Sequence, residues 1–385
     1  MMLAKSLQKI KPSYIREILS VANSPDIISL AGGLPDEATF PLALMQESLS
    51  NLSTMSSLFQ YGTTAGYAPL LDYFRECYQL PSAHDGIVCT GSQQGLDLIA
   101  RAFINPTDKV VMEAPSYLGA IQVFGLAQAN IESVSQQTDG PNLKELEAFF
   151  AKKDVVLFYA VPDFHNPTGV CWSLEVRQKV GQLCQQYDVT LIEDAPYREL
   201  RFSGDELPLA SSFCPDHSLL LRSFSKIATP GLRLGLVTGR SDWIAPLNKV
   251  KQAADLHSST PMQAVLLDLL QHNEFTHHLE KIRHLYQTRY EALIKSITQN
   301  LPSYCHVNTV NGGMFVWLLL PKCNVDALAK SALENGVAVV PSSVFYQDNN
   351  AASALRLNFT NANTEELNDA IKRLAKVIKQ HCEIK

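Results

Sequence analysis

The chain has 385 residues, of which 46% are hydrophobic and 18% charged, and its formal net charge at pH 7 is −6. This composition is typical of a globular protein with a full core, and the absence of a basic stripe argues against nucleic acid as a partner. No apolar run approaches the ~20 residues needed to span a bilayer, and the first residues lack the apolar stretch of a secretory signal, so we expect no membrane association and a cytoplasmic location.

Eight cysteines are spread over the chain without a CxxC pair and without a His/Cys cluster at metal-ligand spacing. Such a distribution favours free thiols that pack as small hydrophobic side chains. We therefore predict neither disulfides nor a metal site, which agrees with a reducing compartment.

The length of the chain predicts two domains, because a single hydrophobic core rarely grows this large. The first residues contain a helix-like stretch, "YIREILSVA", followed by "ISLAGGLPDEATFP". We expect this N-terminal arm, residues 1–40, to pack with a small C-terminal domain, residues 286–385. Residues 41–285 then form the large domain.

From about residue 85, short apolar runs alternate with longer amphipathic stretches, as in "GIVCT" before "GSQQGLDLIARAF" and "VVLFYAV" before "SLEVRQKVGQLCQQY". This alternation predicts an α/β fold, in which helices cover both faces of a mostly parallel sheet. Residues 245–300 read as long helices. The strand-like runs "GGMFVWLLL", "VAVVPS" and "ALRLNFT" predict a smaller α+β domain at the end of the chain.

Polar residues follow several of the predicted strands, and in such sheets ligands bind at the carboxyl ends of the strands. Ser92 and Gln93 open a helix whose free N–H groups suit an anion such as phosphate, although an ordinary helix cap would look the same. Asn166, in "HNPTG", stands in a stretch that could be a simple turn. Asp194 ends an apolar strand and needs a cationic partner if it is buried.

Lys226 lies in "LRSFSKIATPGLRLG", where its neighbours up to Arg233 are apolar or small. A lysine in such surroundings is either compensated structurally or has a lowered pKa that serves chemistry. With Asn166, Asp194 and Tyr197 at neighbouring strand ends, it outlines a cofactor site.

The order of these motifs resembles the class I/II aminotransferases of fold type I, which depend on pyridoxal 5'-phosphate (PLP). The stretches "ISLAGGLPD", "QYGTTAGYAPL", "TGSQQGLDL" and "EAPSYLGAIQVF" are similar to the branch that contains 2-aminoadipate (LysN-like) and kynurenine aminotransferases. The resemblance covers nearly the whole chain. It implies the fold type I architecture, with the sheet in a large domain beside a smaller α+β domain, and PLP as cofactor.

The resemblance also implies roles for individual residues. Lys226 would bind PLP covalently and then carry the substrate proton, Asp194 would keep the pyridine nitrogen protonated, and Tyr197 with Asn166 would contact the ring 3'-oxygen. The other implied cofactor contacts are Ser92, Gln93, Ser223, Ser225 and Arg233 at the phosphate and Tyr117 on the ring face. The implied substrate contacts are Arg356 at the α-carboxylate, Gly33 and Asn166. Arg16 either binds an acidic side chain of the substrate or is simply solvated.

Tyr61, in "FQYGTTAGY", would be an exposed aromatic residue in a single chain. In the family that this sequence resembles, the matching tyrosine reaches the cofactor phosphate of the other subunit. The resemblance therefore implies an obligate homodimer with shared sites.

The expected reaction moves an amino group from an L-amino acid of the 2-aminoadipate, aromatic or branched-chain type to a 2-oxo acid, 2-oxoglutarate, in two ping-pong half-reactions. Two alternatives stay open: a β-eliminating PLP lyase of the same fold, and a PLP-binding regulatory protein. Arg222 stands where the family commonly has a small residue such as glycine, so the family's side-chain specificity does not transfer directly.

Overall fold

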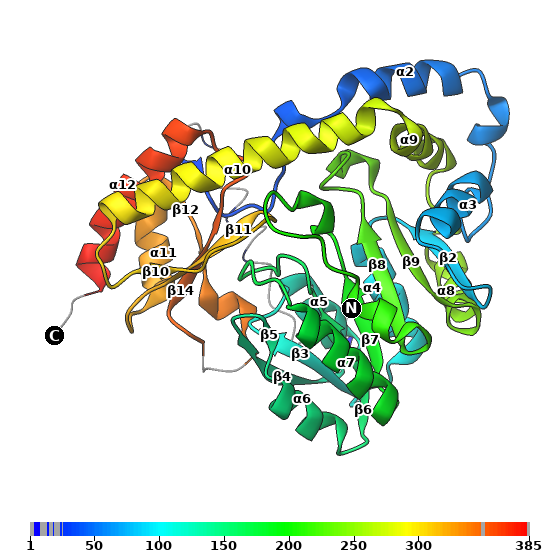
Figure 1. The fold of residues 1–385 in the computed structure, drawn as a ribbon, viewed down its shortest axis with the longest axis horizontal. Coiled ribbons are helices and arrows are strands. Elements are labelled where there is room, and N and C mark those ends of the chain that lie inside the picture. The colour runs from blue at the N-terminus through cyan, green and yellow to red at the C-terminus, as the bar shows by residue number, and fades with distance from the viewer. Residues whose placement is uncertain are drawn as a thin grey trace.

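The computed structural model describes residues 4–7, 14, 18, 24, 26–347 and 351–382. Figure 1 shows one region built around an eight-stranded sheet and a smaller region built around a four-stranded sheet, with the long helix α10 (Glu274–Asn300) running along both. The expected boundary at residue 285 falls inside this helix. The division into domains at residues 40 and 285 remains a prediction.

The large sheet has the strand order β2-β9-β8-β7-β6-β3-β4-β5. The five strands from β8 to β4 run parallel, whereas β9 is antiparallel to both of its neighbours and β5 is antiparallel to β4. This confirms the expected α/β class with a mostly parallel sheet. The strands are β2 (His84–Cys89), β3 (Lys109–Ala114), β4 (Asn130–Gln137), β5 (Gly140–Pro141), β6 (Val155–Ala160), β7 (Thr190–Asp194), β8 (Ser218–Ser223) and β9 (Gly235–Arg240).

Helices cover both faces of this sheet. Successive residues of a strand point to opposite sides, so each strand contributes side chains to the packing on both faces. Ile192 of β7 packs into one hydrophobic cluster and its neighbour Leu191 into another. Local signals set the helix starts: the Ser173 side chain accepts a hydrogen bond from Val176 N–H at the start of α7. The helices are α2 (Leu42–Leu52), α3 (Ala68–Cys77), α4 (Ser92–Phe103), α5 (Leu118–Leu126), α6 (Leu143–Phe150), α7 (Leu174–Tyr187), α8 (Ser241–Ala254) and α9 (Thr260–Gln271).

The small sheet is antiparallel, in the order β10 (His306–Val307), β11 (Phe315–Leu319), β14 (Ala354–Asn358) and β13 (Val340–Pro341). Helices α11 (Val325–Glu334) and α12 (Thr364–His381) pack beside it, as Figure 1 shows. The short strand β1 (Ile28–Ser29) pairs in parallel with β12 (Val337–Ala338), so this part of the N-terminal arm lies against the C-terminal elements.

Short 3-10 helices connect these elements. They are η1 (Lys5–Leu7), η2 (Glu37–Thr39), η3 (Ser56–Phe59), η4 (Arg198–Leu200), η5 (Ala210–Phe213), η6 (Pro215–His217), η7 (Pro230–Leu232) and η8 (Ser342–Phe345). Within the described residues, none of the helices has the length and apolar character that crossing a membrane requires.

Candidate active site

A cavity of about 360 Å³ lies where the carboxyl ends of β6, β7 and β8 meet the N-terminal arm and β14. Every residue that the sequence analysis assigned to the cofactor or the substrate lines this cavity, apart from Tyr61 and Arg16. The predicted residues on its wall are Gly33, Ser92, Gln93, Tyr117, Asn166, Asp194, Tyr197, Ser223, Ser225, Lys226, Arg233 and Arg356.

The Lys226 amine lies inside the cavity and donates a 2.6 Å hydrogen bond to the carbonyl oxygen of Gly33. Burial lowers its pKa to about 8, and the positive charges of Arg356 and Arg233 act in the same direction. Roughly one tenth of the amine is therefore neutral at pH 7, far more than for a lysine with the ordinary pKa of ~10.4. Only the neutral amine has the lone pair needed for attack on a carbonyl carbon or for accepting a proton.

The Asp194 carboxyl group is buried at the end of β7. Burial raises its pKa to about 6, whereas a hydrogen bond from Tyr159 and the charge of Arg222 favour the ionised form. Its Oδ2 atom accepts a 2.8 Å hydrogen bond from the Tyr159 hydroxyl, but its Oδ1 atom is buried without a hydrogen-bond partner. A buried acceptor in this condition is costly unless a ligand supplies a donor.

Asn166 connects two other polar groups of the cavity. Its side-chain nitrogen donates to the Tyr197 hydroxyl at 3.4 Å, and its Oδ1 accepts from Arg356 Nη1 at 2.8 Å. The Arg356 guanidinium also donates to the carbonyl of Ala31 and lies 4.3 Å from the centre of the Phe315 ring. Its Nε remains buried without a partner, and burial lowers its pKa to about 10. This arrangement suits an incoming carboxylate.

The start of α4 forms, with Arg233, a cradle whose groups suit an anion. Gly91 has φ +78°, and a Cβ there would lie 2.7 Å from Arg233 Nη2, so the arginine packs directly over the backbone. The first N–H groups of a helix have no acceptor within the helix and attract negative charge. Beside this cradle, the Tyr117 hydroxyl donates to Gln93 Oε1 at 3.1 Å, and burial raises the pKa of Tyr117 to about 12.

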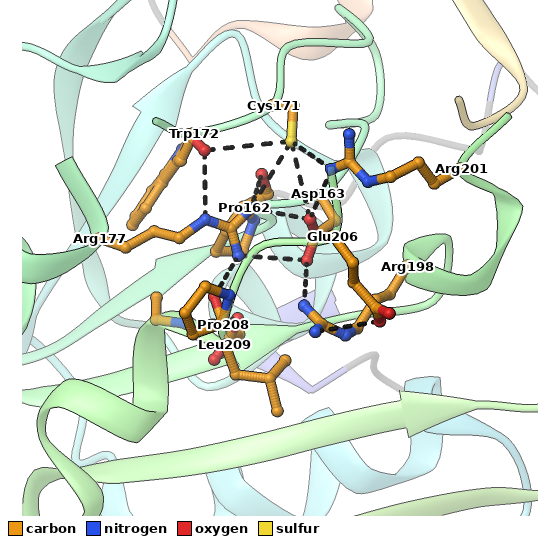
Figure 2. A network of polar contacts seen from close by, with 12 residues as sticks. Pro162, Asp163, Cys171, Trp172, Arg177, Arg198, Arg201, Glu206, Pro208 and Leu209 are labelled. Atoms are coloured by element: carbon orange, nitrogen blue, oxygen red, sulfur yellow. Dashed lines mark hydrogen bonds and ion pairs between the residues drawn. The ribbon is translucent and has the colours of Figure 1, made fainter. Parts of the chain in front are cut away.

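A buried network of polar contacts around Asp163 and Arg177 holds the loop that carries Asn166, as Figure 2 shows. Arg177 of α7 forms an ion pair with Asp163 at 2.7 Å and donates to the carbonyls of Pro162 and Trp172, each at 3.1 Å. Although burial opposes its charge, the Arg177 guanidinium lowers the pKa of Asp163. Two further arginines approach the same carboxylate, Arg198 at 3.5 Å and Arg201 at 3.6 Å. Both ends of the Asn166 loop are thus anchored to one helix.

Two of the predicted residues are not on the cavity wall. Tyr61 is 81% exposed, with its ring edge against His257. Arg16 lies outside the described residues. Arg222 is buried and forms an ion pair with Glu199, which lies two residues after Tyr197 of the cavity wall.

Sequence reasoning did not identify several residues of the wall. The most important is Tyr159, which lies within the apolar run "VVLFYAV" and has no role in the sequence analysis. The others are Leu34, Gly91, Val161, Pro196 and Pro230.

The cavity therefore combines one carboxylate with three cationic side chains, Lys226, Arg233 and Arg356. Its residues fit a ligand with an anionic group at the α4 cradle, an N–H donor at Asp194 and an electrophilic carbon at Lys226, together with a second, carboxylate-bearing molecule at Arg356. Among the described residues, no group of three or more His, Cys, Asp or Glu side chains is arranged to hold a metal ion.

Comparison with known proteins gives concordant results. The family model described as aminotransferase class I and II matches residues 25–374. Aromatic-amino-acid aminotransferase 1 of Thermococcus litoralis is 36% identical, over 96% of this chain and 92% of that protein. The 2-aminoadipate transaminase of Thermus thermophilus is 33% identical, over 97% and 96%.

The crystal structure of the α-aminoadipate aminotransferase LysN from Thermus thermophilus, complexed with N-(5'-phosphopyridoxyl)-L-leucine, superimposes with a TM-score of 0.91. It is 32% identical and covers 98% of this chain and 97% of that one. The fold is therefore that of the fold type I PLP enzymes, and the cofactor is PLP, whose phosphate, ring nitrogen and aldehyde match the cavity described above. The chain belongs to the class I and II aminotransferases.

Proposed function

We propose that this enzyme transfers the amino group of an L-amino acid to 2-oxoglutarate in two ping-pong half-reactions. The observation that carries the proposal is the Lys226 amine, which has a lowered pKa and shares one cavity with the Arg356 guanidinium and with the Asp194 carboxylate, whose Oδ1 atom has no hydrogen-bond partner. The relatives include aminotransferases named for aromatic amino acids and for 2-aminoadipate. We therefore propose a donor of the 2-aminoadipate, aromatic or branched-chain type.

The cavity residues would hold PLP at four points. Asp194 Oδ1 would accept the ring N–H, and Asn166 with Tyr197 would contact the ring 3'-oxygen. Tyr117 would cover one face of the ring. The phosphate would be bound close to the N-terminus of α4, by Ser92, Gln93, Ser223, Ser225 and Arg233. When bound, PLP withdraws electrons from Cα of the amino acid and so permits the loss of the Cα proton.

Lys226 has two tasks in this proposal. Its amine holds the cofactor covalently until the amino acid displaces it, and its neutral Nζ then removes the proton from Cα. The carbonyl of Gly33, 2.6 Å from Nζ, keeps the amine in the cavity while it is free. A pKa of about 8 allows this group to accept and return a proton near neutral pH.

Arg356 positions the amino acid. Its unpartnered Nε, together with the Nη1 and Nη2 atoms that now contact Asn166 and Ala31, would bind the α-carboxylate. The rings of Phe315 and Phe345, 4.3 and 5.1 Å from the guanidinium carbon, fix its plane. Gly33 has no room for a side chain beside the Phe315 ring, because a Cβ there would lie 2.9 Å from it.

An acceptor assay tests this function. Purified protein loaded with PLP is incubated with each candidate L-amino acid and 2-oxoglutarate, and glutamate is measured. We expect glutamate only when both substrates are present, and parallel lines in a double-reciprocal plot. Release of ammonia and a 2-oxo acid without 2-oxoglutarate would instead identify a lyase, and the Lys226→Ala variant serves as the inactive control.

We further propose an obligate homodimer in which Tyr61 of each chain reaches the phosphate site of the other. In support, α2, η3 and the residues on either side of η3 expose large apolar side chains: Leu42, Leu49, Met55, Phe59 and Tyr61. A groove along α2 is lined by three apolar residues, Leu42, Met45 and Leu49, and by the polar Gln46, Ser50 and Ser53. Several large apolar side chains exposed along one segment are typical of subunit interfaces. Sedimentation at equilibrium should give twice the chain mass, and an active monomer would exclude the shared site.

We also propose a cytoplasmic location. All eight cysteines are free thiols, as expected for a protein kept in a reducing compartment.

A further inference from the structure

Tyr159 is the one tyrosine of the cavity wall to which neither the sequence nor the proposed function assigned a task. It lies on β6, where its Cα is paired with Ile192 of the neighbouring strand β7. Since residues two apart on a strand share a face, Tyr159 and Asp194 project from the same side of the sheet. Its hydroxyl is buried and donates a 2.8 Å hydrogen bond to Asp194 Oδ2.

Because of this hydrogen bond, the two oxygens of the Asp194 carboxylate differ in their surroundings. Oδ2 is occupied by Tyr159, whereas Oδ1 has no partner and belongs to a residue on the cavity wall. The Tyr159 ring is itself fixed by an edge contact with Phe124, at 6.0 Å between ring centres. The carboxylate therefore has one orientation that is set by the protein before any ligand arrives.

The charged and titratable groups that act on Asp194 come from each element around it. Burial raises its pKa to about 6, and the Tyr159 hydrogen bond and the Arg222 charge oppose this rise. Burial raises the pKa of three nearby tyrosines, Tyr117, Tyr159 and Tyr197, and the Asp194 charge acts in the same direction. Tyr159 is the only one of these groups with a hydrogen bond to the carboxylate among the contacts of the described residues.

We infer that Tyr159 is a positioning residue that keeps Asp194 ionised and turned toward the ring nitrogen, so that the proton between them stays on the nitrogen. The inference rests on the proposed binding of PLP in this cavity. A proton shared by two bases resides on the more basic one, and a donor on Oδ2 makes the carboxylate less basic. Without that donor, the proton moves toward Asp194 and the ring withdraws electrons less well.

The test uses enzyme loaded with PLP that carries ¹⁵N in the ring, because the ¹⁵N chemical shift reports the proton directly. Wild type should show the protonated value. In Tyr159→Phe, the loss of one hydrogen bond to a charged group should raise the proton affinity of Asp194 by about one to two pH units. The signal should then move toward the unprotonated value, with kcat reduced about tenfold or more and KM little changed.

Tyr187→Phe is the matched control, because the Tyr187 hydroxyl also donates to a carboxylate, Glu147 at 3.3 Å, away from the cavity. It should leave the ¹⁵N signal as in wild type. Circular dichroism and the melting temperature establish that Tyr159→Phe is folded, as we expect because the ring and its packing are retained.

Repeating the Tyr159→Phe change in an Asp194→Asn variant distinguishes the loss of the Tyr159–Asp194 hydrogen bond from a general effect on folding. There the Tyr159→Phe change should cause no further ¹⁵N shift, since no carboxylate remains to be tuned. An unchanged ¹⁵N signal in Tyr159→Phe, or an equal shift in the Asn background, would overturn the inference while leaving the transaminase proposal intact. Failure of the wild type to bind PLP would instead contradict the proposed function.

Discussion

Replacing Arg356 by glutamine removes the positive charge that we propose as the anchor of the substrate carboxylate. A charge-assisted hydrogen bond contributes about 1.5–3 kcal/mol, so the loss of a two-bond contact costs about 3–6 kcal/mol, or about 10²–10⁴ in kcat/KM. In the structure, Arg356 already donates to Asn166 and Ala31, so binding a substrate exchanges existing contacts for new ones. We therefore expect a loss near 10².

The assay compares an amino acid with the corresponding amine that lacks the carboxyl group. Wild type should strongly prefer the amino acid, and Arg356→Gln should lose this preference by the same factor, mainly through KM. Arg101→Gln, which removes an exposed arginine paired with Asp97, is the control and should behave like wild type. If Arg356→Gln retains the wild-type preference, Arg356 does not bind the carboxylate.

Three further predictions follow from the same geometry. The rate at which apoenzyme recombines with PLP should fall about tenfold per pH unit below the Lys226 pKa and should level off above about pH 8. A rate that still rises toward pH ~10.4 would show that Lys226 has the pKa of an ordinary lysine. Mixed dimers of Lys226→Ala and an inactive Tyr61 variant should regain part of the activity, because one of their two sites has both residues intact; no recovery after verified subunit exchange would contradict shared sites. Asp163→Asn should lower the free energy of unfolding by about 3–5 kcal/mol, as measured by urea denaturation, because it leaves the Arg177 charge buried without an opposite charge. The difference in this free energy between wild type and variant should shrink as the pH falls through the lowered Asp163 pKa.

The sheet and most of the cavity could be predicted because their signals are local. The apolar run before Asp194 and the small residues around Lys226 mark strand ends, and a parallel sheet gathers such ends at one edge. The resemblance to a family then extended the prediction to Arg356, whose position in β14 has no local signal of chemistry.

Contacts between distant segments could not be predicted in this way. The Gly33 carbonyl accepts a hydrogen bond from the Lys226 amine, although 193 residues separate the two. No spacing rule reports such a contact, nor the pairing of β1 with β12 shortly before Gly33 in the chain. Tyr159 lies within an apolar run that suits a strand core, and its task depends on the register of β6 against β7. Arg222 illustrates the same limit, since its partner Glu199 lies on a different element.

The account depends most directly on Lys226 as the residue that holds the cofactor. Treating the PLP-loaded enzyme with borohydride fixes the cofactor on the amine to which it is attached, and mass spectrometry of the digested protein then locates the pyridoxyl group. We predict that the peptide containing Lys226 carries it in full yield and that addition of an amino donor before reduction prevents the labelling. A pyridoxyl group on another lysine, or labelling that an amino donor leaves unchanged, would contradict the account.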